Sequence, residues 1–123
     1  MKGNRSLLND LMTISFTFQT YDRYKEFYDV FATSMQQQGH KVGIISGNRE
    51  QERVKIERRL QFKPDFMHLW GEFETISNGS KWKIEKMEQE GVLVHFDEEA
   101  TELKKFTDRW IFKSFNPDNW KVF

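Results

Sequence analysis

The chain has 123 residues with 19 basic and 19 acidic side chains, so its formal net charge at neutral pH is zero. This length suits one domain, and a neutral chain gives no general attraction to nucleic acid or to a membrane surface. Cysteine is absent, which excludes disulfides, thiolate zinc sites and a catalytic thiol, and a reducing, cytoplasmic compartment is expected. No apolar run approaches the ~18 residues that span a bilayer, and no signal peptide is expected.

The first third of the chain predicts two strands with a helix between them. Residues 1–11 have little pattern and predict a loosely attached, flexible N-terminal segment. Residues 13–18 alternate and are rich in β-branched and aromatic side chains, which favours a strand. Aromatic residues and methionine then recur at spacings of three and four over residues 21–35, which predicts an amphipathic helix ended by Gly39. Residues 42–45 are wholly apolar, which is typical of a strand covered on both faces.

The middle of the chain predicts a charged helix and a third strand. Residues 49–60 carry few apolar side chains and predict a mostly exposed helix, whose start Asn48 and Gln51 would cap. Residues 66–70 predict a strand. Residues 71–80 have no clear period and predict a loop or a small hairpin.

The last third predicts two short helices and two strands. A helix that Gly91 ends is followed by an apolar strand over residues 92–96. Asp97 stands at the N-cap position of the next helix, which residues 100–106 predict. Residues 110–115 predict a fifth strand.

Strands and helices thus alternate, which predicts a doubly wound α/β domain with parallel strands over residues 12–115, followed by a tail of residues 116–123. The most apolar strands are residues 13–18, 42–45 and 92–96, and we expect them at the centre of the sheet. In such sheets the ligand lies beyond the carboxyl ends of the strands, where the strand order reverses.

Polar residues follow three of the predicted strands at that edge. They are Thr17, Gln19 and Thr20 at the first strand, Ser46, Gly47 and Asn48 at the second, and Asp97, Glu98 and Glu99 at the fourth. Residues 46–48 either form a turn that caps a helix, which contributes ~1 kcal/mol, or also present backbone N–H groups to a phosphate. Residues 97–99 either stabilise a helix start through its dipole or contact a metal or ligand.

Lysines and histidines near this edge have both structural and functional interpretations. Lys81, Lys83 and Lys86 form a solvated helix face, or one of them belongs to the site. His68 and His95 lie inside apolar runs and are expected to be structural residues with hydrogen-bonded rings, because the histidine spacing matches no zinc motif. Three tryptophans are expected to be packing anchors, namely Trp82, Trp110 and Trp120.

The arrangement of these groups resembles the haloacid dehalogenase-like (HAD) phosphohydrolases. Residues 14–20, Ile-Ser-Phe-Thr-Phe-Gln-Thr, are similar to a first motif of the form ISFDFDGT with both acids replaced. Residues 44–49 are similar to the second motif, with Ser46 at the phosphate-binding position, and residues 94–98 are similar to the acidic fourth motif. The motif lysine would be Lys81, Lys83 or Lys86. The resemblance implies a cap-less, three-layer Rossmann-like fold with a mainly parallel five-stranded sheet in the order 5-4-1-2-3.

The two replaced acids decide which activity the resemblance implies. Thr17 and Gln19 stand where the family has its nucleophile and its general acid–base. Threonine is a poor nucleophile without an adjacent base, and glutamine does not exchange a proton over the working pH range. Asp97 and Glu98 alone would hold Mg²⁺ weakly. The resemblance therefore implies a catalytically deficient domain that binds a protein partner or a phosphorylated ligand.

Two other functions fit the same residues. An active Mg²⁺-dependent phosphatase or nucleotidase would hold the metal with Asp97 and Glu98 and use Asp22 or a water in place of the missing acids. A small interaction or inhibitor protein would use the fold as a scaffold, with the charged residues 49–60 as its contact face.

Overall fold

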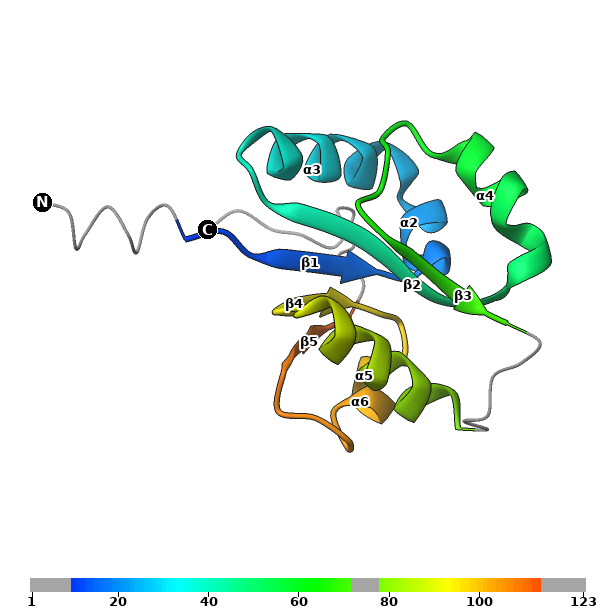
Figure 1. Ribbon diagram of the computed structural model, residues 1–123, viewed down its shortest axis with the longest axis vertical. Coiled ribbons are helices and arrows are strands. Elements are labelled where there is room, and N and C mark those ends of the chain that lie inside the picture. The colour runs from blue at the N-terminus through cyan, green and yellow to red at the C-terminus, as the bar shows by residue number, and fades with distance from the viewer. Residues whose placement is uncertain (1–9, 72–77, 114–123) are drawn as a thin grey trace, which may run out of the picture.

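A computed structural model of the chain describes residues 10–71 and 78–113. The described residues form an α/β domain around a five-stranded, all-parallel sheet in the order β3-β2-β1-β4-β5 (Figure 1). The predicted strand order and the central place of the first, second and fourth strands are therefore confirmed. Most of the predicted N-terminal segment, residues 72–77 and the tail with Trp120 lie outside the described residues.

Strands and helices alternate along the chain as the sequence pattern predicts. The strands are β1 (Thr13–Phe16), β2 (Lys41–Arg49), β3 (Met67–Trp70), β4 (Val94–Phe96) and β5 (Trp110–Phe112). The helices are α2 (Phe18–Arg23), α3 (Lys25–Gln37), α4 (Arg53–Arg59), α5 (Gly79–Glu90) and α6 (Ala100–Leu103), with a short 3₁₀ helix η1 (Glu50–Glu52). Among them, no described helix is long and apolar enough to cross a bilayer.

Helices cover both faces of the sheet, which gives three layers (Figure 1). On one face lie α2, α3 and α4, and Tyr28 and Ile56 pack there in one core with Phe16 of β1. On the other face lie α5 and α6, and Trp82 packs in a second core with Ile45 of β2. Each core removes large apolar side chains from water, at about 1.5–3 kcal/mol for each fully buried one.

The single helix predicted over residues 21–35 is two helices, because the chain breaks at Tyr24 (φ −130°, ψ 53°). The Phe16 ring lies 6.0 Å from the Tyr21 ring and 5.1 Å from the Tyr28 ring. In an unbroken helix those two tyrosines would be about 10 Å apart along the axis. The break therefore lets both rings contact the same phenylalanine on β1.

The second strand is longer than its apolar run predicts. Residues 46–48 do not form a turn, because β2 continues to Arg49 with a shift of register against β3 between Ile45 and Arg49. Glycine and asparagine are poor strand formers, so the sequence favours a break there. The side chain of Ser46 holds this irregular segment with hydrogen bonds described below.

Two predicted helix caps are wrong. The helical segment after β2 begins at η1, where the Glu52 carboxylate accepts a hydrogen bond from the Arg49 backbone N–H at 3.1 Å. Asn48 is instead bonded to Gln19 of α2 and to Ser46. The N-cap of α6 is Glu99, two positions after the predicted cap Asp97, whose carboxylate accepts the Glu99 N–H at 2.8 Å.

The predicted glycine positions are confirmed, whereas one tryptophan differs. Gly39 and Gly91 follow α3 and α5 with positive φ angles of 94° and 66°. Trp82 is fully buried, but 60% of Trp110 is exposed, so Trp110 is not a packing anchor. Its strand is at the edge of the sheet. On the face where the Trp110 side chain lies, no described helix covers β5.

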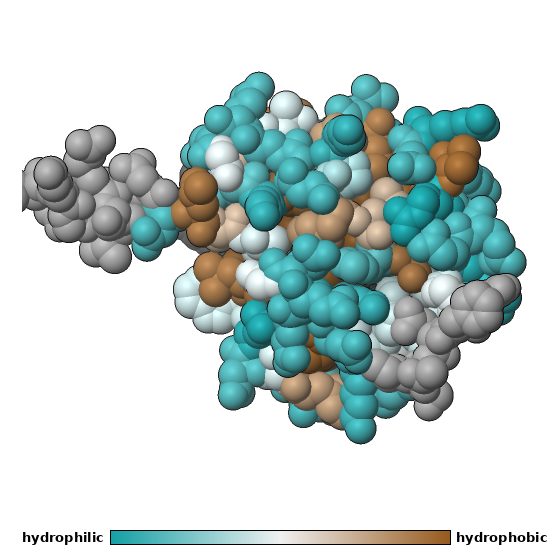
Figure 2. All heavy atoms as spheres, in the orientation of Figure 1, coloured by the Kyte–Doolittle hydropathy of each residue, from teal (hydrophilic) through white to brown (hydrophobic). Residues whose placement is uncertain are grey.

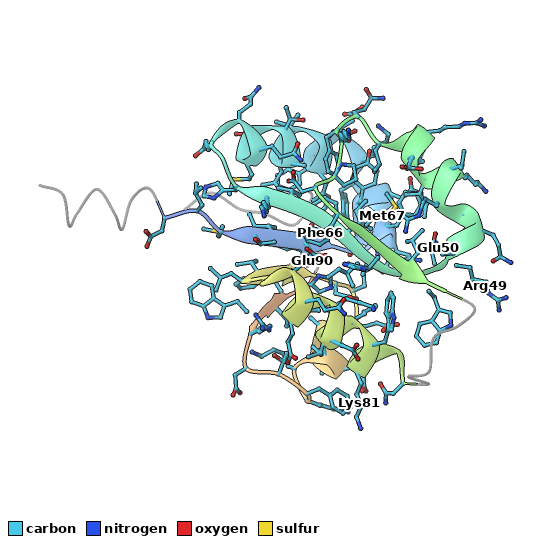
Figure 3. All side chains as sticks on the ribbon, viewed as in Figure 1. Arg49, Glu50, Phe66, Met67, Lys81 and Glu90 are labelled. Atoms are coloured by element: carbon cyan, nitrogen blue, oxygen red, sulfur yellow. The ribbon has the colours of Figure 1, made fainter. Side chains whose placement is uncertain are left out.

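Gly43 is required by a close approach of an aromatic ring. A Cβ atom at this position would lie 2.3 Å from Phe66, whose ring packs against the sheet in the second core (Figure 3). We expect Gly43→Ala to lower the free energy of unfolding by about 1–3 kcal/mol through overpacking, measured by urea denaturation. Gly47→Ala is the matched control, because a Cβ there meets nothing within 4 Å. Equal stability of the two variants would contradict the prediction.

Candidate functional site

The carboxyl edge of the central strands gathers most of the predicted polar residues into two groups. The amide–hydroxyl cluster consists of Gln19, Ser46 and Asn48, where β1 leads into α2 beside the end of β2. The buried polar chain consists of Ser15, Lys83, His95 and Asp97, beneath the ends of β1 and β4.

Ser46 is the centre of the amide–hydroxyl cluster and is fully buried. Its Oγ accepts the backbone N–H of Phe18 at 3.1 Å. It also lies 3.1 Å from Gln19 Oε1 and 2.5 Å from Asn48 Oδ1, and because a hydroxyl has one proton it donates to one of them at a time. Gln19 Nε2 donates to Asn48 Oδ1 at 2.9 Å, which closes the cluster.

Thr17 and Thr20 have a structural role at the start of α2. The Thr17 hydroxyl accepts the Thr20 backbone N–H at 3.2 Å and donates to the Thr20 hydroxyl at 3.0 Å. Both threonines are buried, so Thr17 is an N-cap whose hydroxyl is already used. Gly47, by contrast, is exposed on the outer side of the β2 irregularity.

The buried polar chain links three elements through hydrogen bonds. Ser15 Oγ lies 2.7 Å from His95 Nδ1, and His95 Nε2 lies 3.0 Å from Asp97 Oδ2. Lys83 of α5 donates to the same Asp97 Oδ2 at 2.9 Å. Ser15 and His95 have no exposed surface, and Asp97 is 2% exposed.

The protonation of this chain follows from burial and charge. Burial lowers the pKa of His95, and the nearby Lys83 charge lowers it further against the opposing effect of Asp97. His95 is therefore neutral at neutral pH, and we assign its proton to Nε2, so that Nδ1 accepts the Ser15 hydroxyl proton. Burial alone would raise the pKa of Asp97, but its hydrogen bond with His95, the neighbouring charges and the Glu99 N–H bring that pKa below its usual value.

Serine, histidine and aspartate in hydrogen-bonded series are also the parts of a hydrolytic triad. A triad serine must reach the scissile carbonyl. Ser15 lies inside β1 with its side chain wholly enclosed, opposite His95 on the neighbouring strand β4. The arrangement therefore stabilises the fold and positions Asp97, and it does not present a nucleophile.

Only one of the three candidate lysines reaches the edge of the central strands. Lys83 is buried against Asp97. The Lys81 ammonium lies 5.6 Å from the centre of the Phe106 ring, and its side chain extends away from the sheet (Figure 3). Lys86 is half-buried and makes no ion pair with any residue in the ranges 10–71 and 78–113.

The two candidate metal ligands face different partners. Asp97 is bound to His95 and Lys83, whereas Glu98 forms an exposed ion pair with Arg23 at 3.1 Å. Within the part of the chain that the structure describes, no three histidine or acidic side chains form a group that could hold a metal ion. An ammonium 2.9 Å from Asp97 would also repel a divalent cation there.

The histidine prediction is confirmed, but the sequence analysis missed the role of Ser15. His95 is hydrogen-bonded at both ring nitrogens, and His68 of β3 lies 2.6 Å from Glu90 of α5. A signal for Ser15 was present in the alternation, since residues 13, 15 and 17 of the predicted strand share one face and all carry hydroxyls.

The chain matches no protein-family model, no curated protein and no solved structure.

Protonation of His95 is expected to make stability depend on pH. The pKa of this ring is lowered in the folded state, so the unfolded chain takes up the proton first as pH falls below its ordinary value of about 6.5. The stabilisation is complete above that pH and is lost as pH falls through the folded-state pKa. Between about pH 7.5 and about pH 5.5 we expect a loss of about 1 kcal/mol from this group.

Urea denaturation of His95→Gln at both pH values measures this loss, because the variant has no ring to protonate. The parent chain, measured at the same two pH values, is the reference. If the stability of the parent chain and that of His95→Gln depended equally on pH, the prediction that His95 protonation destabilises the fold would be refuted.

Removing the ammonium from the buried polar chain is expected to be severe. Lys83→Met keeps the length of the side chain but leaves the Asp97 carboxylate buried without its cation, at a cost of about 3–5 kcal/mol. Lys81→Met, two residues earlier and exposed, should change stability by less than about 0.5 kcal/mol. Chemical denaturation measures the free energy of unfolding of both variants. A similar small loss of stability in each would contradict the prediction.

Proposed function

We propose that this chain is a HAD-like domain that has lost phosphoryl-transfer chemistry and acts by binding a protein partner. The order of the strands and the place of the polar groups at their carboxyl ends support the HAD-like part of this proposal. The hydrogen bonds and the ion pair that those groups already form within the chain support the loss of phosphoryl transfer and the choice of a protein partner.

The loss of catalysis is supported first by the groups at the end of β1. Thr17 caps α2, and Gln19 shares its amide with Ser46 and Asn48, so neither supplies a nucleophile or a transferable proton. Asp97, the buried carboxylate of this edge, is held as an ion-pair partner of Lys83. Asp22, the substitute acid, pairs with Arg59 on the surface.

Between a protein partner and a phosphorylated ligand, the geometry favours the protein. The single observation that carries this choice is the state of the buried Ser46 hydroxyl, which is bonded to Phe18 N–H and to two side-chain amides. A phosphate would have to displace the amides of Gln19 and Asn48 to reach it, and to separate Lys83 from Asp97 to gain a cation. A macromolecular partner that binds the surface requires neither change.

The charged segment 49–60 is not the favoured contact face. Arg53 is paired with Glu50 at 2.6 Å, and Arg59 is paired with Asp22, so two of its cations are already neutralised. Exposed pairs of this kind contribute little to stability and are typical of a solvated helix.

A phosphatase assay tests the loss of catalysis. With a generic phosphomonoester and Mg²⁺, we expect no turnover above about 10²-fold over background, a rate that positioning alone can reach. Turnover above that level that Asp97→Asn abolishes, while Glu98→Gln keeps it, would overturn the proposal in favour of a metal-dependent phosphatase.

A titration with inorganic phosphate tests the choice of partner. We expect no saturable change in the backbone amide resonances of residues 17–20 and 46–48 below millimolar phosphate. Saturable changes that Ser46→Ala removes would instead support a phosphorylated ligand.

A further inference from the structure

The edge strand β5 presents two large aromatic side chains to solvent. Trp110 is 60% exposed and Phe112 is 49% exposed, whereas Ile111 between them is 8% exposed and belongs to the second core. The Phe112 ring contacts Phe96 at 5.8 Å, and Phe96 in turn contacts Phe31 of α3 at 5.9 Å. The two exposed rings therefore continue the first core outward, beyond the last helix that covers it.

The backbone of β5 is also open on its outer side. The Phe112 carbonyl accepts the Asp97 N–H at 2.9 Å, so the polar backbone groups of Phe112 face β4. Because these groups alternate in direction along a strand, those of Ile111 point to the outer edge of the sheet. No residue that the structure describes pairs with this edge, and β5 is last in the order of strands. An open edge of this kind is a template for a further strand.

The segment that leads into β5 and forms it is basic, although the chain as a whole is neutral. Residues 104–113 contain four basic side chains and one acidic one, which are Lys104, Lys105, Arg109, Lys113 and Asp108. Lys104 donates to the Arg109 carbonyl at 2.9 Å, and Arg109 donates to the Val92 carbonyl at 2.5 Å. Lys105 is paired with Glu102 at 3.0 Å, whereas backbone carbonyls hold Lys104 and Arg109 without neutralising them. The segment therefore keeps an excess of positive charge.

The charge distinguishes between possible occupants of the edge. A second copy of this chain would bring the same excess of basic residues against itself, which is unfavourable at such short range. Residues 114–123 carry one acidic and one basic side chain and supply no excess of negative charge. An acidic segment from another protein complements the edge in both charge and backbone hydrogen bonding.

We propose that the outer edge of β5, with Trp110 and Phe112, binds an extended acidic segment of a protein partner, which adds a sixth strand to the sheet. The proposal rests on the proposed function, because it names the surface and the chemistry of the partner. Backbone hydrogen bonds to Ile111 align the segment, its apolar side chains cover the two aromatic rings, and its carboxylates lie near Lys104, Arg109 and Lys113. The face seen in Figure 2 is mostly hydrophilic, with apolar side chains only in small separate groups.

Selection of random peptides displayed on phage against the full chain tests this surface. We expect the selected peptides to carry an excess of aspartate and glutamate next to apolar residues. Synthetic copies should bind more weakly as salt is raised, because screening removes the attraction of the basic segment. Trp110→Ser and Phe112→Ser should each weaken binding by at least about 10-fold, as for aromatic anchors in other interfaces.

Matched variants separate the edge from the rest of the surface. Lys113→Glu should weaken binding of the acidic peptides, and Val54→Ser, at a 58% exposed apolar position on α4, should leave it unchanged. Circular dichroism confirms that each variant is folded, and because all four positions are exposed no loss of folding is expected. Peptides without an acidic excess, equal binding by the Trp110 and Phe112 variants, or no selected peptide would each overturn the proposal.

Two other results would assign the edge to a different occupant and would also overturn it. A dimer of the full chain that Phe112→Ser dissociates would assign the edge to a second copy. Peptide binding that appears only after deletion of residues 114–123 would assign it to the chain itself. Phosphatase turnover together with peptide binding at β5 would overturn only the proposed loss of catalysis. Peptide binding at another surface without turnover would overturn only the assignment of the binding surface to β5.

Discussion

One buried carboxylate, that of Asp97, determines what the carboxyl edge of this sheet can do. Its Oδ2 accepts from both His95 and Lys83, and its Oδ1 accepts from the Glu99 backbone. Through these bonds the end of β4 is tied to α5 and to the start of α6, and the contact of His95 with Ser15 ties it to β1. A carboxylate held in this way stabilises the fold because its charge is matched, and for the same reason it is not free to bind a metal or to accept a proton from a substrate.

The amide–hydroxyl cluster imposes a similar constraint on the neighbouring strand end. β2 continues past its apolar run because Ser46 binds the Phe18 backbone while Gln19 and Asn48 bind Ser46. Groups that would recognise an anion in an open turn are thereby used to join the start of α2 to β2. The edge thus has polar residues at the predicted positions, but their hydrogen bonds are internal. The proposal of binding at the outer surface rests on this observation.

The uncovered aromatic rings of β5 follow from the topology. Three of the described helices lie on the face that Trp110 and Phe112 share with Phe96, and they cover β1, β2 and β3. The connections after β3 and β4 contribute α5 and α6 to the opposite face. Among the residues that the structure describes, helices therefore cover the last strand on one face only. Its two exposed rings lie next to a basic segment and a backbone edge with no described partner.

The sequence by itself determined the alternation of strands and helices, the three central strands, the glycines that end α3 and α5, and the polar positions at the strand ends. These features depend on periodicity and on local backbone preference, which act over a few residues. Only the tertiary structure decided the break at Tyr24, the length of β2, the choice of Lys83 among three lysines and the exposure of Trp110. Each of these depends on contacts between segments distant in the sequence, such as Ser15 with His95 across 80 residues, or on which face of the sheet a later helix covers. A local sequence pattern contains no information on either.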